Sequence, residues 1–164
     1  MAKKKKVPQQ QALSPERYIK EKARLLPIVE CWITDGWDKC GLGTAIVARQ
    51  HKNGNYTLGI YMFDTFCCGL TDSLYHFNVP EYEYREMLEE GCATLEMNPI
   101  SYEELHNLIY GAVAFAEEAG LGPHSSFKLT QYILEEDTDE IPLIEYEFGK
   151  DGKHFLVATS RFQV

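Results

Sequence analysis

The feature that most constrains the fold is the turn signal Asn53-Gly54, which lies between two runs of β-prone residues. Asn-Gly between such runs is the strongest short-range signal for a β-hairpin, because both residues tolerate the positive φ of a tight turn. The sequence therefore predicts two antiparallel strands, at 43–50 and 56–66, joined by a two-residue turn.

A two-residue turn sets the pairing of the two strands. Val47 would lie opposite Ile60, and Asp64 would lie opposite Gly43, on the same face as Ile60. Both faces of the hairpin are then largely apolar. A hairpin that is apolar on both sides needs packing on each face, or a ligand or partner on one of them.

Other periodic segments predict further elements. Ser101 and Glu104 form a capping box that begins a helix ending near Gly120. Asp151-Gly152 predicts the turn of a second hairpin. Its strands are 143–149 and 153–159, with Ile144, Tyr146, Phe148, Phe155 and Val157 on the buried face and Glu145 and Glu147 on the other. The remaining predicted elements are helices at 14–26, 80–91 and 125–135 and strands at 28–33 and 73–77.

These elements predict an α+β fold, an antiparallel sheet built from two hairpins with two to four helices packed on it. A chain of 164 residues is long enough for one domain. The segment 1–12 combines four lysines with Pro8 and glutamines and has little apolar area to bury. We therefore expect a disordered basic leader at 1–12 and a single domain at 13–164.

The charge of the chain argues against a nucleic-acid-binding body. The net charge is -9, and removing Lys3 to Lys6 leaves -9 minus 4, or -13. Phosphate binding requires clustered lysines and arginines, which only the leader supplies. An acidic run, Glu135 to Glu140, is interpreted as a solvated loop, with a site for a cation or a basic partner as the alternative.

The cysteine content and the absence of an export signal predict a cytoplasmic protein. The five cysteines are an odd number, and they have neither the pairing of a disulfide framework nor the spacing of zinc ligands. No apolar stretch follows the leader as in a secretory signal, and none is long enough to span a bilayer. We expect free thiols and predict neither a metal nor a cofactor.

Several short motifs resemble those of an uncharacterised bacterial domain family of unknown function. They are Pro15-Glu16-Arg17-Tyr18-Ile19-Lys20, Lys22-Ala23-Arg24 with Leu26-Pro27-Ile28, Gly54-Asn55 with Thr57, Gly59, Tyr61 and Asp64, and Asp72 with Tyr75 and Phe77. The similarity covers most of the chain after residue 13. It implies a bacterial cytoplasmic protein and transfers no activity or site residue.

Reactive side chains gather after the second strand. Asp64 follows an aromatic run, and a buried carboxylate needs hydrogen-bond donors, which the turn at Cys67 can supply. This structural interpretation is preferred for Asp64 and for Asp72. The alternative is a hydrolase-type site in which Cys67 is the nucleophile, His76 the base, and Asp64 or Asp72 orients the base.

No motif names a reaction, so the preferred interpretation is a non-enzymatic binding or protein-interaction module. An exposed aromatic patch that includes Trp32, Trp37 or Tyr61 would support it. The first alternative is the small enzyme built on Asp64, Cys67, Asp72 and His76. The weaker alternative is association with nucleic acid through the leader Lys3 to Lys6.

Overall fold

The protein forms an α+β fold around a five-stranded antiparallel sheet with strand order β4-β3-β2-β1-β5. The computed structural model describes residues 13–94 and 96–155, with residues 91–94 described by their backbone alone. The predicted fold class is confirmed, whereas the leader lies outside the described residues. The strands are β1 (Ile28–Thr34), β2 (Leu42–Gln50), β3 (Tyr56–Asp64), β4 (Gly69–Val79) and β5 (Met97–Pro99).

The central hairpin forms as predicted, but its register differs by one residue. His51 donates its N–H to Asn55 O at 2.8 Å, so the loop has three residues and ends at Gly54, where φ is +91°. Asn53 does not take the positive φ that a two-residue type I′ turn requires. As a result Ile46, and not Val47, lies opposite Ile60. A shift by one residue exchanges the faces of every β2 side chain relative to β3.

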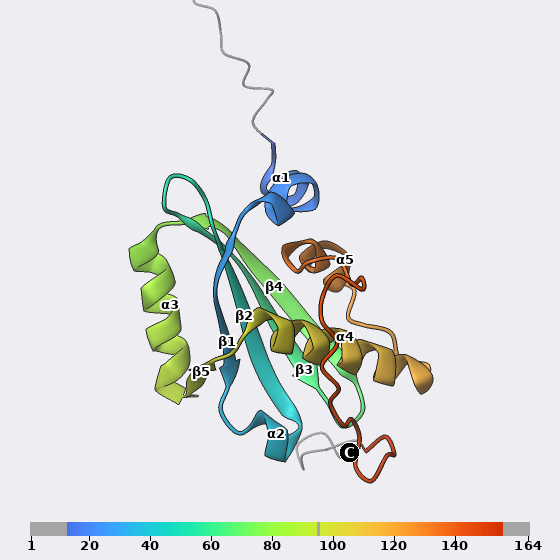
Figure 1. The fold of residues 1–164 in the computed structure, drawn as a ribbon. Coiled ribbons are helices and arrows are strands. Elements are labelled where there is room, and N and C mark those ends of the chain that lie inside the picture. Colours follow the sequence, from blue (N-terminus) through green and yellow to red (C-terminus); the bar gives the residue numbers. More distant parts are fainter. Residues whose placement is uncertain (1–12, 95, 156–164) are drawn as a thin grey trace, which may run out of the picture.

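One face of the sheet is covered by helices α1 (Pro15–Lys22), α4 (Tyr102–Glu118) and α5 (Phe127–Thr130) (Figure 1). The predicted capping box at Ser101 begins α4. Short 3-10 turns, η2 (Ala23–Leu25) and η3 (Gln131–Ile133), follow α1 and α5. The helices and the sheet enclose the main core, which includes Val47, Tyr61, Phe63, Leu105, Leu108 and Ile109.

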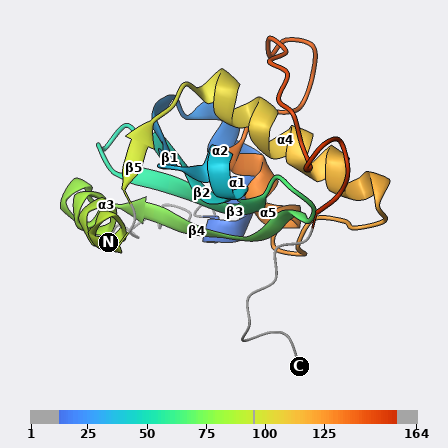
Figure 2. The same cartoon turned by 90° about the horizontal axis from the view of Figure 1, so that it is seen from below.

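The opposite face is covered in part by α3 (Glu81–Thr94), which lies across the sheet from α4 (Figure 2). Tyr84 of α3 stacks on Tyr56 with ring centroids 4.5 Å apart, and its hydroxyl donates to Glu30 at 2.6 Å. Beyond α3, Leu42 and Leu74 stay partly exposed. The apolar hairpin is thus fully packed on one face and half-covered on the other.

The second predicted hairpin contributes no strand within the described residues. Its turn is present, since Lys150 and Lys153 bridge around Asp151 and Gly152, both of which have positive φ. The segment 143–149 runs across α4 without joining the sheet (Figure 1). The predicted partner strand lies mostly outside the described residues. The sheet is therefore a single meander extended by β5 and not a pair of hairpins.

Two smaller differences concern connections. The segment before α4, for which no element was predicted, contains β5, which pairs with β1 through Trp32 and Pro99. A short helix, α2 (Trp37–Cys40), lies in the loop between β1 and β2. Among the described residues, no helix has the length and apolar character that crossing a bilayer would take.

Candidate functional site

Asp64 caps the turn between β3 and β4. Its Oδ1 accepts from Phe66 N at 2.9 Å and Cys67 N at 3.3 Å, and its Oδ2 accepts from Cys68 N at 3.2 Å. The residue is 3% exposed. A buried carboxylate of this kind is stabilised by the hydrogen bonds that it accepts from backbone N–H groups. The geometry matches the structural interpretation of Asp64.

We expect Asp64→Ala to lower the free energy of unfolding by about 2–4 kcal/mol, because three buried N–H groups lose their acceptor. Urea unfolding monitored by circular dichroism measures the change. Asp64→Asn should cost less, since one amide oxygen still accepts. The matched control is Asp72→Asn, whose half-exposed side chain should cost less than about 1 kcal/mol. Equal losses for Asp64→Ala and Asp72→Asn would contradict the capping role.

The four groups of the enzyme hypothesis do not converge. His76 pairs with Leu58, whereas Asp64 pairs with Gly69 at the far end of the same two strands. Asp72 accepts from its neighbour Ser73 N at 2.8 Å and lies near His124 at 3.5 Å, away from His76. Cys67 therefore has neither base nor orienting carboxylate in the predicted arrangement.

The thiol of Cys68, beside Cys67 in this turn, is a poor nucleophile in its environment. Burial, with the carboxylate of Asp64 next in importance, raises the pKa of Cys68 to about 12. A thiol with such a pKa is protonated at neutral pH and reacts slowly. The four cysteines whose side chains are described, Cys31, Cys40, Cys67 and Cys68, are all unpaired. Free thiols were expected at these positions.

The three aromatic candidates for binding do not form one exposed patch. Tyr61 is completely buried and donates its hydroxyl to Thr130 O at 2.7 Å, so it cannot contribute to an exposed patch. Trp32 is half-buried and donates Nε1 to Tyr84 at 3.0 Å. Trp37 packs edge-on against Phe63 and Tyr146, with 5.9 Å between ring centroids in each case. Tyr146, which Trp37 contacts, also lines a groove on the surface.

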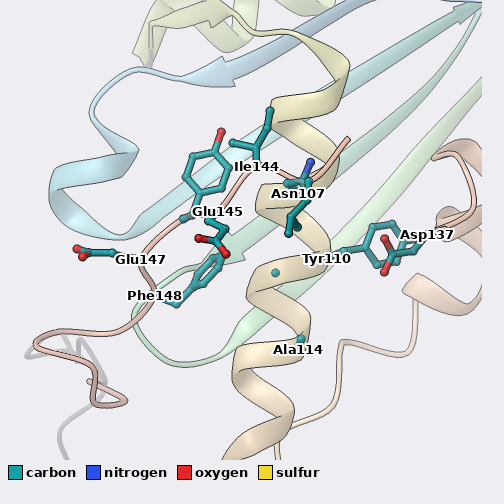
Figure 3. Close-up of a pocket in the computed structure, with 11 residues that line it drawn as sticks. Asn107, Tyr110, Ala114, Asp137, Ile144, Glu145, Glu147 and Phe148 are labelled. Atoms are coloured by element: carbon teal, nitrogen blue, oxygen red, sulfur yellow. The ribbon is translucent and has the colours of Figure 1, made fainter. Parts of the chain in front are cut away.

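The groove lies between α4 and the segment 143–148 and has a volume of about 620 Å³ (Figure 3). We call it the acidic groove. Asn107 anchors the segment by donating Nδ2 to Pro142 O at 2.9 Å. The predicted alternation survives here without a strand: the even-numbered side chains are half-buried and the odd-numbered ones exposed. The lining side chains are Asn107, Tyr110, Ala114, Asp137, Leu143, Ile144, Glu145, Tyr146, Glu147 and Phe148, together with Gly111.

Asp137 is held at one end of the groove by a buried histidine. His106 is 1% exposed, and its Nε2 lies 3.0 Å from Asp137 Oδ1. Its Nδ1 lies 2.7 Å from the hydroxyl of Tyr102, which accepts from Glu135 N at 2.7 Å. A carboxylate only accepts hydrogen bonds, so the hydrogen between the side chains of Asp137 and His106 lies on Nε2 of His106. His106 thus donates to Asp137 and positions its carboxylate.

The charge of the acidic groove has one sign. Three carboxylates, Asp137, Glu145 and Glu147, line it, and among the residues that the structure describes no lysine, arginine or histidine does. Burial raises the pKa of Tyr110 to about 12 and also raises the pKa of Tyr146, so both phenols stay neutral. Figure 3 shows Asp137 beside Tyr110 and Glu145 near the ring of Phe148. This arrangement suits a cation with an apolar stem.

The sequence contained signals for part of this groove. The acidic run predicted that Asp137 is solvated, with a site for a cation or a basic partner as the alternative. The alternation around Tyr146 predicted that the segment 143–149 has one buried face and one exposed face. The contribution of α4, and His106 behind Asp137, had no local signal. Among the described residues, no three histidine, cysteine, aspartate or glutamate side chains gather in a way that could hold a metal ion.

No family model, no curated protein and no solved structure matches the chain. The resemblance to an uncharacterised bacterial family therefore stays a prediction. The functional argument rests on the geometry of the groove.

Proposed function

We propose that the protein is a non-enzymatic interaction module whose acidic groove binds a cationic segment of a partner protein. The observation that carries the proposal is a groove of about 620 Å³ that combines three carboxylates with three aromatic rings and, within the described part of the chain, has no basic lining residue. Lysine and arginine side chains bury an apolar stem and keep the charged head in a polar setting. In this groove the aromatic rings can contact the apolar stem and the carboxylates can contact the charged head.

The aromatic rings supply the apolar part of this recognition. Tyr146 and Phe148 lie with ring centroids 6.5 Å apart, and Phe148 stacks against Phe115 at 5.9 Å. Packed rings with locked rotamers bind an aliphatic stem or a cation at a low entropic cost. The rings are therefore preformed walls of the groove.

Asp137 and Glu145 supply the polar part. His106 uses only Oδ1 of Asp137 among the described contacts, so Oδ2 is available to an ammonium or guanidinium donor. A hydrogen bond to a charged donor is about twice as strong as a neutral one. Because the carboxylate is already oriented, less ordering is required on binding.

The test is a titration of the full chain with fluorescein-labelled hexalysine, followed by fluorescence anisotropy. We expect Asp137→Asn combined with Glu145→Gln to weaken binding by about tenfold or more, through loss of the charge-assisted contacts. Raising the salt concentration should weaken binding to the unmodified protein more steeply than binding to this variant, because exposed ion pairs are screened.

The matched control is Glu83→Gln combined with Glu86→Gln, which changes the net charge equally. Both residues are exposed on α3, across the sheet from the groove. The control should weaken hexalysine binding by less than about threefold. Equal weakening by the two variants would mean attraction to net charge alone and would overturn the proposed site.

A further inference from the structure

The outer edge of β4 is a second surface with unused binding capacity. β4 is the terminal strand of the sheet and pairs only with β3. At its start, Leu70 O accepts from His124 N at 3.0 Å. From Ser73 to Phe77, no backbone bond from the described residues reaches the outer edge.

Two contacts establish which backbone groups point outward. Ser73 N donates to Oδ1 of its neighbour Asp72, which lies near His124 on the outer side. In the β2–β3 hairpin His51 N bonds to Asn55 O, so with alternation along β3 the backbone groups of Leu58 and Ile60 face β4. Their partners His76 and Leu74 therefore face inward, and the N–H and C=O groups of Tyr75 between them face outward.

The middle of this edge lacks the devices that normally protect a terminal strand. Exposed edges usually carry a lysine, a proline or a β-bulge. The pairing of β4 with β3 is irregular near its two ends, between Leu70 and Asp72 and between His76 and Val79, but it is regular from Ser73 to His76, and that stretch has neither lysine nor proline. Such an edge is a template for an additional strand.

A groove of about 390 Å³ runs beside the edge, between β4 and α5. Tyr75 and Leu129 form its apolar walls. The only charged side chain that lines it is Lys128, which is exposed and forms no ion pair with the described residues. In a chain of net charge -9, an isolated lysine beside a free strand edge favours an occupant that carries a carboxylate.

We propose that this edge binds an extended segment of a partner protein by strand addition. The segment bonds to the outward N–H and C=O groups of Tyr75, places an apolar side chain between Tyr75 and Leu129, and places an acidic side chain at Lys128. Main-chain hydrogen bonds provide the affinity and alternate side chains the specificity. The surface is independent of the acidic groove and of its cationic ligand.

The probe is a synthetic seven-residue peptide of alternating valine and threonine in which one valine is replaced by glutamate. We expect saturating peptide to slow amide hydrogen exchange at Tyr75 by about tenfold or more, with little change at Leu74 and His76, which already bond to β3. Slowing confined to any other strand or helix would overturn the proposal.

A matched pair of variants isolates the backbone contact. Tyr75→Pro and Tyr75→Val both remove the ring, but only the proline removes the outward N–H, and proline is tolerated on an edge strand. We expect Tyr75→Pro to bind the peptide roughly tenfold more weakly than Tyr75→Val. Equal affinities would contradict strand addition.

A charge exchange keeps the proposal testable even if the proline variant fails to fold. Lys128→Glu should weaken binding of the peptide that carries glutamate. A peptide in which lysine replaces that glutamate should bind the Lys128→Glu variant well and the unmodified protein weakly. Absence of this exchange would overturn the assignment of an acidic partner.

Two other occupants would also overturn it. A dimer by light scattering that Tyr75→Pro dissociates and Tyr75→Val does not would identify a second copy at the edge. Peptide binding that appears only after deletion of residues 156–164 would identify the chain's own terminus.

Discussion

Replacing Arg49 by methionine is expected to lower the free energy of unfolding by about 3–4 kcal/mol, because buried acceptors lose their only strong donor. Arg49 is 1% exposed. Its guanidinium donates Nε to Ile133 O and Nη1 to Leu26 O, both at 2.6 Å, and Nη2 to Glu135 at 2.8 Å. One side chain therefore joins β2 to the ends of two helical segments. Urea unfolding, with midpoint and slope both recorded, measures the effect.

The control for Arg49→Met is Arg17→Met. Arg17 also makes an ion pair at 2.8 Å, with Glu21, but its side chain is 66% exposed. An exposed pair one helical turn apart contributes less than about 0.5 kcal/mol. If the two variants lost similar stability, the contacts of Arg49 would not be the reason for its effect.

Gly69→Ala is expected to lower the free energy of unfolding by about 3 kcal/mol or more. Gly69 has φ of +70°, which disfavours any residue with a side chain. An added Cβ would also lie 2.8 Å from Ala112 O and 2.8 Å from the Cβ of Ala116, both on α4. Because a backbone oxygen cannot move aside alone, the β3–β4 turn and α4 would have to separate. Thermal and urea unfolding measure the loss.

Gly36→Ala separates the two contributions. Gly36 has a similar φ of +79°, and nothing lies within 4 Å of its added Cβ. Its substitution should cost only the conformational part, about 1–2 kcal/mol. Equal losses at the two glycines would show that the contact between the turn and α4 contributes nothing.

Local signals in the sequence predicted most of the elements. The capping box at Ser101, the helix start at Ser14 and the turn at Asp151-Gly152 are all present, because each depends on residues within one turn of the chain. The Asn53-Gly54 hairpin was predicted correctly, but its loop length was wrong. Two-residue and three-residue loops both place a glycine at positive φ, so the dipeptide alone does not decide the register.

Local sequence patterns could not predict the contacts between segments that are distant in the sequence. Alternation around Tyr146 predicted a strand, yet an extended segment lying on a helix shows the same alternation, and only tertiary packing distinguishes the two. Arg49 stands among apolar strand residues, and its acceptors at Leu26 and Ile133 are carbonyls, for which no side-chain pattern exists. The same limit applies to His106, whose partner Asp137 comes from a different segment.

Sequence patterns located little of the candidate site. The candidate residues Asp64, Asp72 and His76 lie apart on the sheet, and the preference for a binding module over an enzyme stays a prediction. Tyr61, a candidate for an exposed aromatic patch, is inside the core. The acidic run supplied one wall of the groove, and the helix that completes it is fixed only by the packing of α4 on the sheet.

The strand order has a consequence for how the chain acquires its structure. Four consecutive strands, β1 to β4, each pair with the next in sequence, so three sheet contacts form across short loops. Short loops lose little entropy on closure, and proteins dominated by local contacts fold quickly. β5 and α4 join from farther along the chain once the meander offers a surface. Folding is thus expected to proceed from the Asn53-Gly54 hairpin outward, with the acidic groove among the last parts to form.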